Sequence, residues 1–553
     1  MNDLYNSKKL IWSLLAAFVI VWLYVLGVRT LVPPDEGRYA EMAREMWASG
    51  DWITTRLNGI KYFEKPPLQT WMNALSFAAF GLGEWQARLW TGLCGLGGVF
   101  LTGYAGHRVF GARAGFYAAL ALGSSLFWVA CGQIDSLDMG LSGMTTIVLC
   151  AVLIAQHDGA TERERRNWML VCWAGMALAV LAKGLIGLVL PGAVLVLYTA
   201  LSRDLAIWKR LHLGKGLLLF FAIATPWFVL VGLKNPEQPH FFFIHEHWER
   251  FFLKTHHREG AWYYFLVLLI PGIMPWLGVL PQAMFHGIRR EPGAAFQPKL
   301  LLLIWAVFIT FFFSYSSSKL PGYILPIYPA LALLIATYLE GASRLNRMIA
   351  AGLLILVGVA GLAAVPQMAQ MAVRHPDERI LLEAYQPWVL TAAIVAAAGG
   401  AIAMLHARHL RRDLAVLTLA IAGFVSVQLI LTGFEPYGKM RAGKELAMKM
   451  LPELQADTKI YSVNTYEQSM TFYLQRTVTL VDYWDEFTFG LRQQPELSIP
   501  TVEGFIEKWE EHSAANVKAL AIVSDDAYEK LKAKGVTMRV IAEDTRRLVI
   551  TNL

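Results

Sequence analysis

The stretch LIWSLLAAFVIVWLYVLGV, Leu10 to Val28, holds no charged residue and decides the fold class of this chain. About 20 consecutive apolar residues are what an α-helix needs to cross the hydrocarbon core of a bilayer. Runs of this kind recur as far as about residue 433, and the chain is 56% hydrophobic and only 16% charged. We therefore predict a polytopic α-helical membrane protein. The basic start resembles a signal peptide, but no small-residue cleavage site follows, so we interpret the run as a retained first span.

About thirteen spans are expected if each takes roughly 20 residues. The doubtful stretch is 168–201, where Lys183 and Gly184 interrupt about 34 residues that would measure roughly 50 Å as one helix, against a core of ~30 Å. Two short spans with Lys183 at a membrane surface fit better. The expected spans are 10–28, 86–106, 113–132, 139–156, 168–182, 184–201, 216–233, 262–284, 300–314, 321–339, 347–365, 387–405 and 413–433.

Basic residues gather in alternate loops, and this orients the spans. Loops rich in Lys and Arg stay in the cytoplasm, so the N-terminus is predicted to be cytoplasmic. The first loop, 29–85, the loop 234–261 and the residues after 433 then lie on the opposite side. The basic loops carry Lys8 and Lys9, Arg108 and Arg113, Arg163, Arg165 and Arg166, Arg203, Lys209 and Arg210, Arg289 and Arg290, Arg344 and Arg347, and Arg408, Arg411 and Arg412.

The segment 434–553 is charged, mixed and free of any membrane-length run. Strand-like runs alternate in it with helical stretches, which predicts a small water-soluble α/β domain. We therefore divide the chain into a membrane domain, 1–433, and a soluble domain, 434–553. The expected strands are 459–463, 477–481, 519–523 and 547–550, and the expected helices lie near 441–451, 501–513 and 526–534.

Carboxylates and cations cluster at the outer end of the first span, in Pro34-Asp35-Glu36-Gly37-Arg38-Tyr39-Ala40-Glu41 and Tyr62-Phe63-Glu64-Lys65-Pro66-Pro67. Charges held at a bilayer edge are costly and so indicate a functional site. The spacing of apolar residues from Glu36 to Trp47 predicts an amphipathic helix lying in the membrane interface. Asp35 has an ordinary alternative as a helix N-cap, and Lys65 as a lysine that reaches from the interface into water.

A second carboxylate pair, Asp135 and Asp138, lies between two apolar spans. In a helix, a spacing of three would place both on one face, and either could instead cap the next span.

The loop around residue 245 is rich in histidine. His245 and His247, together with Glu64 or Glu246, could ligate a divalent metal such as zinc, magnesium or manganese. Histidines two apart do not share a helical face, so solvated surface histidines are the alternative. Arg250 is better suited to phosphate, which a guanidinium can bind with two hydrogen bonds.

Several classes of function are disfavoured. The four cysteines, Cys94, Cys131, Cys150 and Cys172, lie in apolar spans and resemble small hydrophobic residues. No G-x-x-x-x-G-K-[ST] phosphate loop occurs, so an activated substrate should arrive through the lipid. The net charge of +7 comes mostly from the cytoplasmic loops, and no nucleic-acid partner is implied.

Six segments together resemble the class C, membrane-embedded glycosyltransferases that use polyprenyl-phosphate sugars, and within them the undecaprenyl phosphate-aminoarabinose transferases. The segments are Pro34-Asp35-Glu36-x-Arg38-Tyr39-Ala40-Glu41, Ser49-Gly50-Asp51-Trp52-Ile53, Tyr62-Phe63-Glu64-Lys65-Pro66, Glu246-His247-x-x-Arg250-Phe251, Trp262-Tyr263-Tyr264 and Lys319-Leu320-Pro321-x-Tyr323-Ile324-Leu325.

The resemblance implies inverting transfer of 4-amino-4-deoxy-L-arabinose from undecaprenyl phosphate to lipid A phosphates. This would occur at the outer face of a Gram-negative inner membrane, by a monomer, and would weaken the binding of polymyxin. Asp35 and Asp138 match acidic residues that the family requires. Our predicted catalytic residues are Asp35, Asp138 and Glu36; those for the carrier phosphate are Lys65, Arg250, Arg38, Lys183 and Tyr323; and the metal ligands are Glu64, His245 and His247.

The role of Asp35 stays open at this stage. With a phosphate acceptor it would orient that acceptor, stabilise developing oxocarbenium charge or pair with the donor's amine, whereas a hydroxyl acceptor would need it as a general base. The alternatives to the whole assignment are a sister enzyme using another polyprenyl-phosphate sugar, a transporter and a scaffold. A transporter should carry charges in mid-span and repeated halves, but here the charges gather at one face.

Overall fold

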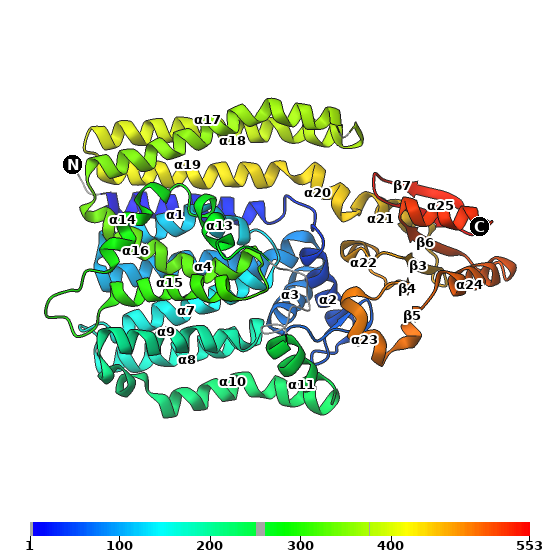
Figure 1. Cartoon of the computed structure of the whole chain (residues 1–553), viewed down its shortest axis with the longest axis horizontal. Coiled ribbons are helices and arrows are strands. Elements are labelled where there is room, and N and C mark those ends of the chain that lie inside the picture. The colour runs from blue at the N-terminus through cyan, green and yellow to red at the C-terminus, as the bar shows by residue number, and fades with distance from the viewer. Residues whose placement is uncertain (1–3, 250–259, 375) are drawn as a thin grey trace.

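The computed structural model describes residues 4–249, 260–374 and 376–553. Long helices lie side by side in a bundle, and a smaller domain with a β-sheet sits at one end of it (Figure 1). The helices of the bundle are α1 (Lys8–Val25), α4 (Glu84–Phe110), α5 (Ala112–Ser124), α6 (Leu126–Cys131), α7 (Leu137–Gln156), α8 (Glu162–Lys183), α9 (Ile186–Ser202), α10 (Leu213–Lys234), α13 (Tyr264–Gly272), α14 (Leu280–Gly287), α15 (Pro298–Tyr315), α16 (Tyr328–Gly341), α17 (Arg344–Arg374), α18 (Arg379–Arg408) and α19 (Arg412–Gly433).

A helix lies at each of the thirteen expected positions, and the membrane character is clear. Within the described residues, eight helices are long and apolar enough to cross a membrane, or nine if one bent pair counts as a span. The other expected spans coincide with α4, with the broken pair α5 and α6, with α8, and with α9, which is only 17 residues long. The count of about thirteen therefore stays a prediction.

Two breaks in the bundle bear on the site. The expected break after Lys183 is confirmed: α8 ends at Lys183, and Gly184 adopts a φ of +86° that favours glycine. The expected span 262–284 is not one straight helix, because α13 and the segment Leu277–Gly287 meet at a bend of 113°. Pro271 and Pro275 lie at this bend, and proline lacks the amide hydrogen that a continuous helix would use.

The first loop folds into two short helices, α2 (Asp35–Ser49) and α3 (Leu68–Phe80), with a small hairpin of β1 (Arg56–Leu57) and β2 (Ile60–Lys61) between them. The predicted amphipathic helix is confirmed as α2, but its predicted place in the membrane interface is wrong. Its apolar side chains Tyr39, Met42 and Met46 are buried in one cluster with residues of the soluble domain. Protein, rather than lipid, covers this face.

The soluble domain is an α/β fold. Its sheet has the strand order β5-β4-β3-β6-β8-β7. Strands β5, β4, β3 and β6 are parallel to one another, and β8 is antiparallel to both of its neighbours, β6 and β7. The strands are β3 (Lys459–Val463), β4 (Thr479–Val481), β5 (Ser498–Ile499), β6 (Ala519–Val523), β7 (Arg539–Glu543) and β8 (Leu548–Thr551). The helices are α20 (Glu435–Ala442), α21 (Lys444–Met450), α22 (Gln468–Leu474), α23 (Thr488–Gln493), α24 (Val502–Ala514) and α25 (Asp525–Ala533).

Polar contacts hold the soluble domain against the first loop. The backbone N–H of Leu31 donates to the Tyr473 hydroxyl at 3.0 Å, and the Ser469 hydroxyl donates to the Leu31 carbonyl at 3.1 Å. The Asn58 amide spans the same interface, bonding both the N–H and the carbonyl of Val478 at 2.7 Å. The soluble domain therefore has a defined position over the loop that carries the predicted catalytic residues.

Candidate active site

A cavity of about 510 Å³ lies between the first loop, the ends of several bundle helices and the soluble domain. It contains most of the site residues predicted from the sequence. Of the residues that the structure describes, six carboxylates and three cations line it: Asp35, Glu64, Asp138, Glu246, Asp485 and Glu486, with Arg38, Lys65 and Lys183.

Asp35 begins helix α2 and faces this cavity. The cap position belongs to Pro34, which makes no side-chain cap bond, so Asp35 is not the N-cap. Its carboxylate is 54% exposed and accepts from Arg38 Nη1 at 2.7 Å, while Arg38 Nε donates to Glu486 at 2.7 Å. Asp35 is therefore held by Arg38 and still accessible to a substrate.

Asp138 lies in the first turn of α7, on the far wall of the cavity. It forms an ion pair with Lys183, whose ammonium also lies 4.6 Å from the centre of the Tyr323 ring. The chain passes close to this pair at Gly322, where a Cβ atom would come within 2.3 Å of the Asp138 carboxylate. The break after α8 thus places Lys183 at the site, and only glycine fits beside its partner.

Lys65 lies in the extended stretch before two prolines. Its ammonium donates to Glu246 Oε2 at 2.8 Å and to the Glu64 carbonyl at 2.7 Å. Glu246 is almost fully buried, with 3% of its side chain exposed. An arriving phosphate could exchange with this carboxylate on Lys65.

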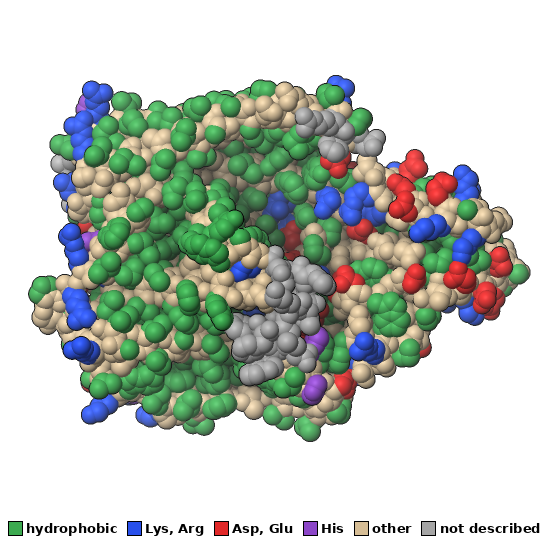
Figure 2. Space-filling view, viewed as in Figure 1, with side chains coloured by type: hydrophobic (Ala, Val, Ile, Leu, Met, Phe, Trp, Pro, Cys, Tyr) green, Lys and Arg blue, Asp and Glu red, His purple; other side chains and the backbone are tan. Residues whose placement is uncertain are grey.

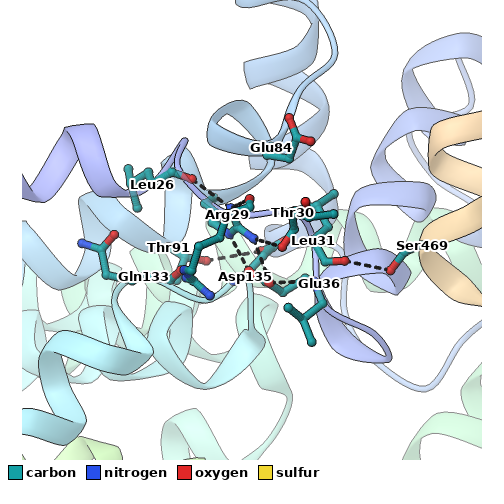
Figure 3. A network of polar contacts seen from close by, with 12 residues as sticks. Leu26, Arg29, Thr30, Leu31, Glu36, Glu84, Thr91, Gln133, Asp135 and Ser469 are labelled. Carbon is teal, nitrogen blue, oxygen red and sulfur yellow. Dashed lines mark hydrogen bonds and ion pairs between the residues drawn. The ribbon is translucent and has the colours of Figure 1, made fainter. Parts of the chain in front are cut away.

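Glu36, the third predicted catalytic residue, lies outside the lining of the cavity. Its carboxylate is enclosed with Arg88, which bonds both oxygens at 2.6 and 2.9 Å. Figure 3 shows Glu36 in one network of polar contacts with Arg29, Thr30 and Asp135. Burial opposes ionisation, but the Arg88 charge holds the pKa of Glu36 below its ordinary value. Arg88 also donates to the carbonyls of Leu26, Arg29 and Thr30, which places this pair in the scaffold of the first loop.

Asp135 and Asp138 would share a face only if the segment that holds both were helical, and this condition is not met. Asp135 precedes α7 and is fully buried, where it accepts from Gln69 at 2.7 Å and Asn73 at 2.8 Å. Its backbone N–H donates to Glu36 at 2.9 Å. Because the helix starts only at residue 137, the two aspartates do not share a helical face.

The soluble domain supplies three lining residues that sequence reasoning missed: Gln468, Asp485 and Glu486. Glu486 accepts from Arg38 at 2.7 Å, from the Tyr62 hydroxyl at 3.3 Å and from Gln468 at 2.7 Å. All three follow the carboxyl ends of the parallel strands β3 and β4, the edge where open α/β sheets usually bind ligands. Their position at this edge was the one feature of the sequence that could have pointed to these three residues.

Replacing Glu486 by Gln should lower the sugar transfer that the sequence predicts, by about tenfold or more, because Arg38 would lose a charged hydrogen bond that positions it against Asp35. The amide keeps the shape of the carboxylate. Turnover of purified protein measures this, and Glu510→Gln, an exposed carboxylate on α24, is the matched control. Wild-type turnover in a folded Glu486→Gln protein would show that the soluble domain does not shape the site.

The predicted metal ligands are only partly described. Glu64 lines the cavity, and the His245 ring stacks on Phe241 at 5.2 Å between centres. No group of three or more His, Cys, Asp or Glu side chains suited to a metal occurs within the described part of the chain. The side chain of His247 and the whole of Arg250 lie outside that part. Both assignments stay predictions.

Two family models match the chain. Residues 64–230 match the dolichyl-phosphate-mannose-protein mannosyltransferase family, and residues 446–552 match the aminoarabinose transferase C-terminal domain. The crystal structures of an oligosaccharyltransferase from Archaeoglobus fulgidus include one in the apo form that is 11% identical, covers 94% of this chain and 70% of its own, and has a TM-score of 0.52, which shows a shared fold alone.

The two family models, together with the charged cavity at the end of the bundle, identify the chain as a membrane-embedded glycosyltransferase. An arabinosyl transferase of Edwardsiella ictaluri is 30% identical over 91% of this chain and 90% of its own. The crystal structure of ArnT from Cupriavidus metallidurans bound to undecaprenyl phosphate is 40% identical, covers 99% of both chains and has a TM-score of 0.93. The chain belongs to the family of undecaprenyl phosphate-α-4-amino-4-deoxy-L-arabinose arabinosyl transferases.

Proposed function

We propose that this protein moves 4-amino-4-deoxy-L-arabinose from undecaprenyl phosphate to phosphate groups of lipid A, with inversion at the sugar carbon. Family membership supports the donor. The observation that carries the proposal is the single cavity that holds Asp35, Lys65, Asp138 and Lys183 at the end of the bundle.

The reaction forms one bond and breaks one bond. An oxygen of the acceptor phosphate bonds to the anomeric carbon, and the bond between that carbon and the carrier phosphate breaks. The electron pair of the broken bond leaves with undecaprenyl phosphate. The acceptor is already an anion, so no strong base has to remove a proton. Inversion requires the acceptor to approach opposite the leaving phosphate.

The cations of the cavity would stabilise the leaving phosphate. Lys65 and Lys183 each hold a carboxylate in the described structure, Glu246 and Asp138 respectively. A phosphate entering the cavity would take over at least one of these ammonium groups. Charge that develops on the leaving oxygen is then met by a group already in place.

The carboxylates that line the described part of the cavity suit an amino sugar. A phosphate donor alone would call for a cationic cavity, but the protonated amine of this sugar brings a positive charge of its own. Asp35, half-exposed, could pair with that amine or stabilise the positive charge that develops on the sugar ring.

The proposed location is the inner membrane, with the cavity and the soluble domain in the periplasm. Figure 2 shows Lys and Arg side chains gathered at the end of the bundle opposite the soluble domain, with a broad apolar surface between. Loops rich in Lys and Arg stay in the cytoplasm, so the basic end of the bundle is assigned to the cytoplasmic side. The soluble domain then faces the periplasm.

Mass spectrometry of lipid A tests this function. Cells that carry the gene should show lipid A heavier by one or more aminoarabinose groups and should resist polymyxin, and cells without it should not. A different sugar on lipid A, or the same sugar on another acceptor, would replace the proposal by a sister activity.

We also propose a divalent ion near Glu64. Chelation and Glu64→Ala should each lower transfer, and elemental analysis should show less metal in the Glu64→Ala protein than in the wild type. Glu496→Ala, which changes a carboxylate of the soluble domain that does not line the cavity, is the control. Metal-free protein with full turnover would show that the cations of the cavity suffice.

A further inference from the structure

Two carboxylates of helix α2, Glu41 and Glu45, lie outside the lining of the cavity, and the proposed reaction makes no use of them. They are four residues apart, a spacing that places both side chains on one face of a helix. Both are buried where α2 packs against the soluble domain. We call these two residues the Glu41–Glu45 pair. Burial of two carboxylates side by side needs an explanation, because it is costly unless each charge is compensated or removed.

One arginine lies beside the Glu41–Glu45 pair, and Glu41 uses its hydrogen bonds. Arg44 Nε and Nη2 donate to the two oxygens of Glu41, at 2.6 and 2.7 Å. Glu45 Oε2 accepts from the backbone N–H of Gly59 at 2.8 Å. Its other oxygen, Oε1, is buried and has no hydrogen-bond partner among the residues that the structure describes. A buried polar atom left unpaired costs free energy, so this oxygen needs a hydrogen bond.

A proton on Glu45 would supply that bond. Two carboxyl groups can share a hydrogen bond only when one of them is protonated, and Glu41 is the carboxyl group that Glu45 can reach. Burial, and next the charge of Glu41, raises the pKa of Glu45 to about 8, against the opposing effects of the Gly59 bond and Arg44. Glu45 is therefore neutral below about pH 8 and negatively charged above it.

The other titratable groups described around the pair are Arg44 on α2, Arg56 in the hairpin and Tyr466 in the loop between β3 and α22. Arg56 donates to the carbonyl of Gly59 at 3.2 Å. Burial, and next the charge of Glu41, raises the pKa of Tyr466 well above its ordinary value. Neither arginine nor a tyrosine of raised pKa changes charge between about pH 5 and 9. The charge at this position therefore changes only through the carboxyl groups of the pair.

Glu45 supports one of the contacts that hold the soluble domain in place. It accepts from Gly59, in the turn of the hairpin between α2 and α3. Asn58, the neighbouring residue of the same turn, bonds both backbone groups of Val478 in the soluble domain. A movement of this turn away from α2 would therefore disturb the contact between the hairpin and the soluble domain.

Tyr466 connects the pair to the cavity from the side of the soluble domain. Its ring packs edge to face on Phe487, with 4.9 Å between the ring centres. Phe487 follows Glu486, which holds Arg38 at 2.7 Å in the cavity. Repulsion between two buried negative charges at the pair would therefore act on the contact that positions Glu486.

We propose that Glu41 and Glu45 share one proton, and that loss of this proton at alkaline pH loosens the docking of the soluble domain on the first loop. The inference goes beyond the proposed function, since it holds whichever sugar is transferred. Its sign follows from the raised pKa of Glu45: the folded chain keeps a proton that the unfolded chain releases above the ordinary value of 4.5. The stability that the pair contributes therefore decreases as the pH rises from about 4.5 to about 8 and does not recover above it.

Thermal unfolding of the full-length protein in detergent, between about pH 5.5 and pH 9, tests the shared proton. Glu45→Gln imitates the neutral carboxyl group, because its amide oxygen can accept from Gly59 and its amide hydrogen can donate to Glu41. The unfolding temperature of Glu45→Gln, relative to wild type, should rise by roughly 5 °C across this range, because only the wild type loses the proton. Glu529→Gln, an exposed carboxylate on α25, is the matched control and should follow the wild type at every pH.

Hydrogen exchange tests the docking. At pH 9 the backbone amides of the hairpin and of α22 should exchange several-fold faster in the wild type than in Glu45→Gln, and at pH 5.5 they should exchange equally. Comparing the two proteins at the same pH removes the effect of pH on the exchange chemistry itself. Equal exchange at pH 9 would show that the pair does not control the docking.

A further measurement needs only the wild type, and it applies if Glu45→Gln does not fold. Infrared spectroscopy should show the carbonyl band of a protonated, buried carboxyl group that disappears near pH 8. A wild type without such a titrating band overturns the inference, as does a difference in unfolding temperature between Glu45→Gln and wild type that stays constant with pH. None of these readouts requires sugar transfer, so a failure of the proposed function is distinguishable from a failure of the shared proton.

Discussion

Asp35→Asn and Asp138→Asn proteins will insert and fold normally but will transfer sugar at least about 100-fold more slowly than wild type. Both carboxylates face the cavity, and Asp35 is 54% exposed, so an amide of the same size fits without strain. The change removes a negative charge from the lining of the proposed active site, for which we expect an effect of about 3–4 kcal/mol on the barrier. Turnover of purified protein, with membrane abundance measured beside it, checks this.

Asp457→Asn is the control for this pair, because Asp457 is exposed in the soluble domain and does not line the cavity. It should transfer sugar at the wild-type rate. Near-normal turnover in a well-inserted Asp35→Asn protein would remove Asp35 from the reaction, and the mechanism proposed for the cavity would fall with it.

Glu36→Gln and Arg88→Met will instead lower the free energy of unfolding by about 3–5 kcal/mol each, because each leaves its partner charged, buried and unpaired. Arg88 is fully buried and holds three backbone carbonyls of the segment between α1 and α2 as well as Glu36. Reduced membrane abundance and a lower unfolding temperature should appear in both variants. The double variant Glu36→Leu/Arg88→Met should recover part of the loss, since it leaves no unpaired charge.

Arg379→Met is the matched control, because it breaks an exposed ion pair with Glu383 on α18. Its unfolding temperature should stay at the wild-type value. A Glu36→Gln protein that folds as well as wild type yet transfers no sugar would return Glu36 to the catalytic residues and contradict the structural role argued from its burial.

The transmembrane character and much of the soluble domain were predictable, because they depend on local properties of the chain. The length of an apolar run and the position of Gly184 can be read without knowing any neighbour in space. The strands 459–463 and 519–523 were predicted with their observed limits, since both are short apolar runs rich in β-branched residues or alanine. The two-residue strand β5 and the seven-residue helix α22 were missed, because elements this short leave too weak a local pattern.

The sequence by itself determined that this is a membrane-embedded transferase with an acidic and basic first loop, and it named Asp35, Lys65, Asp138 and Lys183, which the structure brings to one cavity. Only the tertiary structure separated Asp35 from its neighbour Glu36. Successive residues of a helix point about 100° apart, so Asp35 faces the cavity while Glu36 faces Arg88. Only the tertiary structure, too, placed Glu486 beside Arg38, because contacts across some 450 residues depend on how domains pack and leave no local pattern to read.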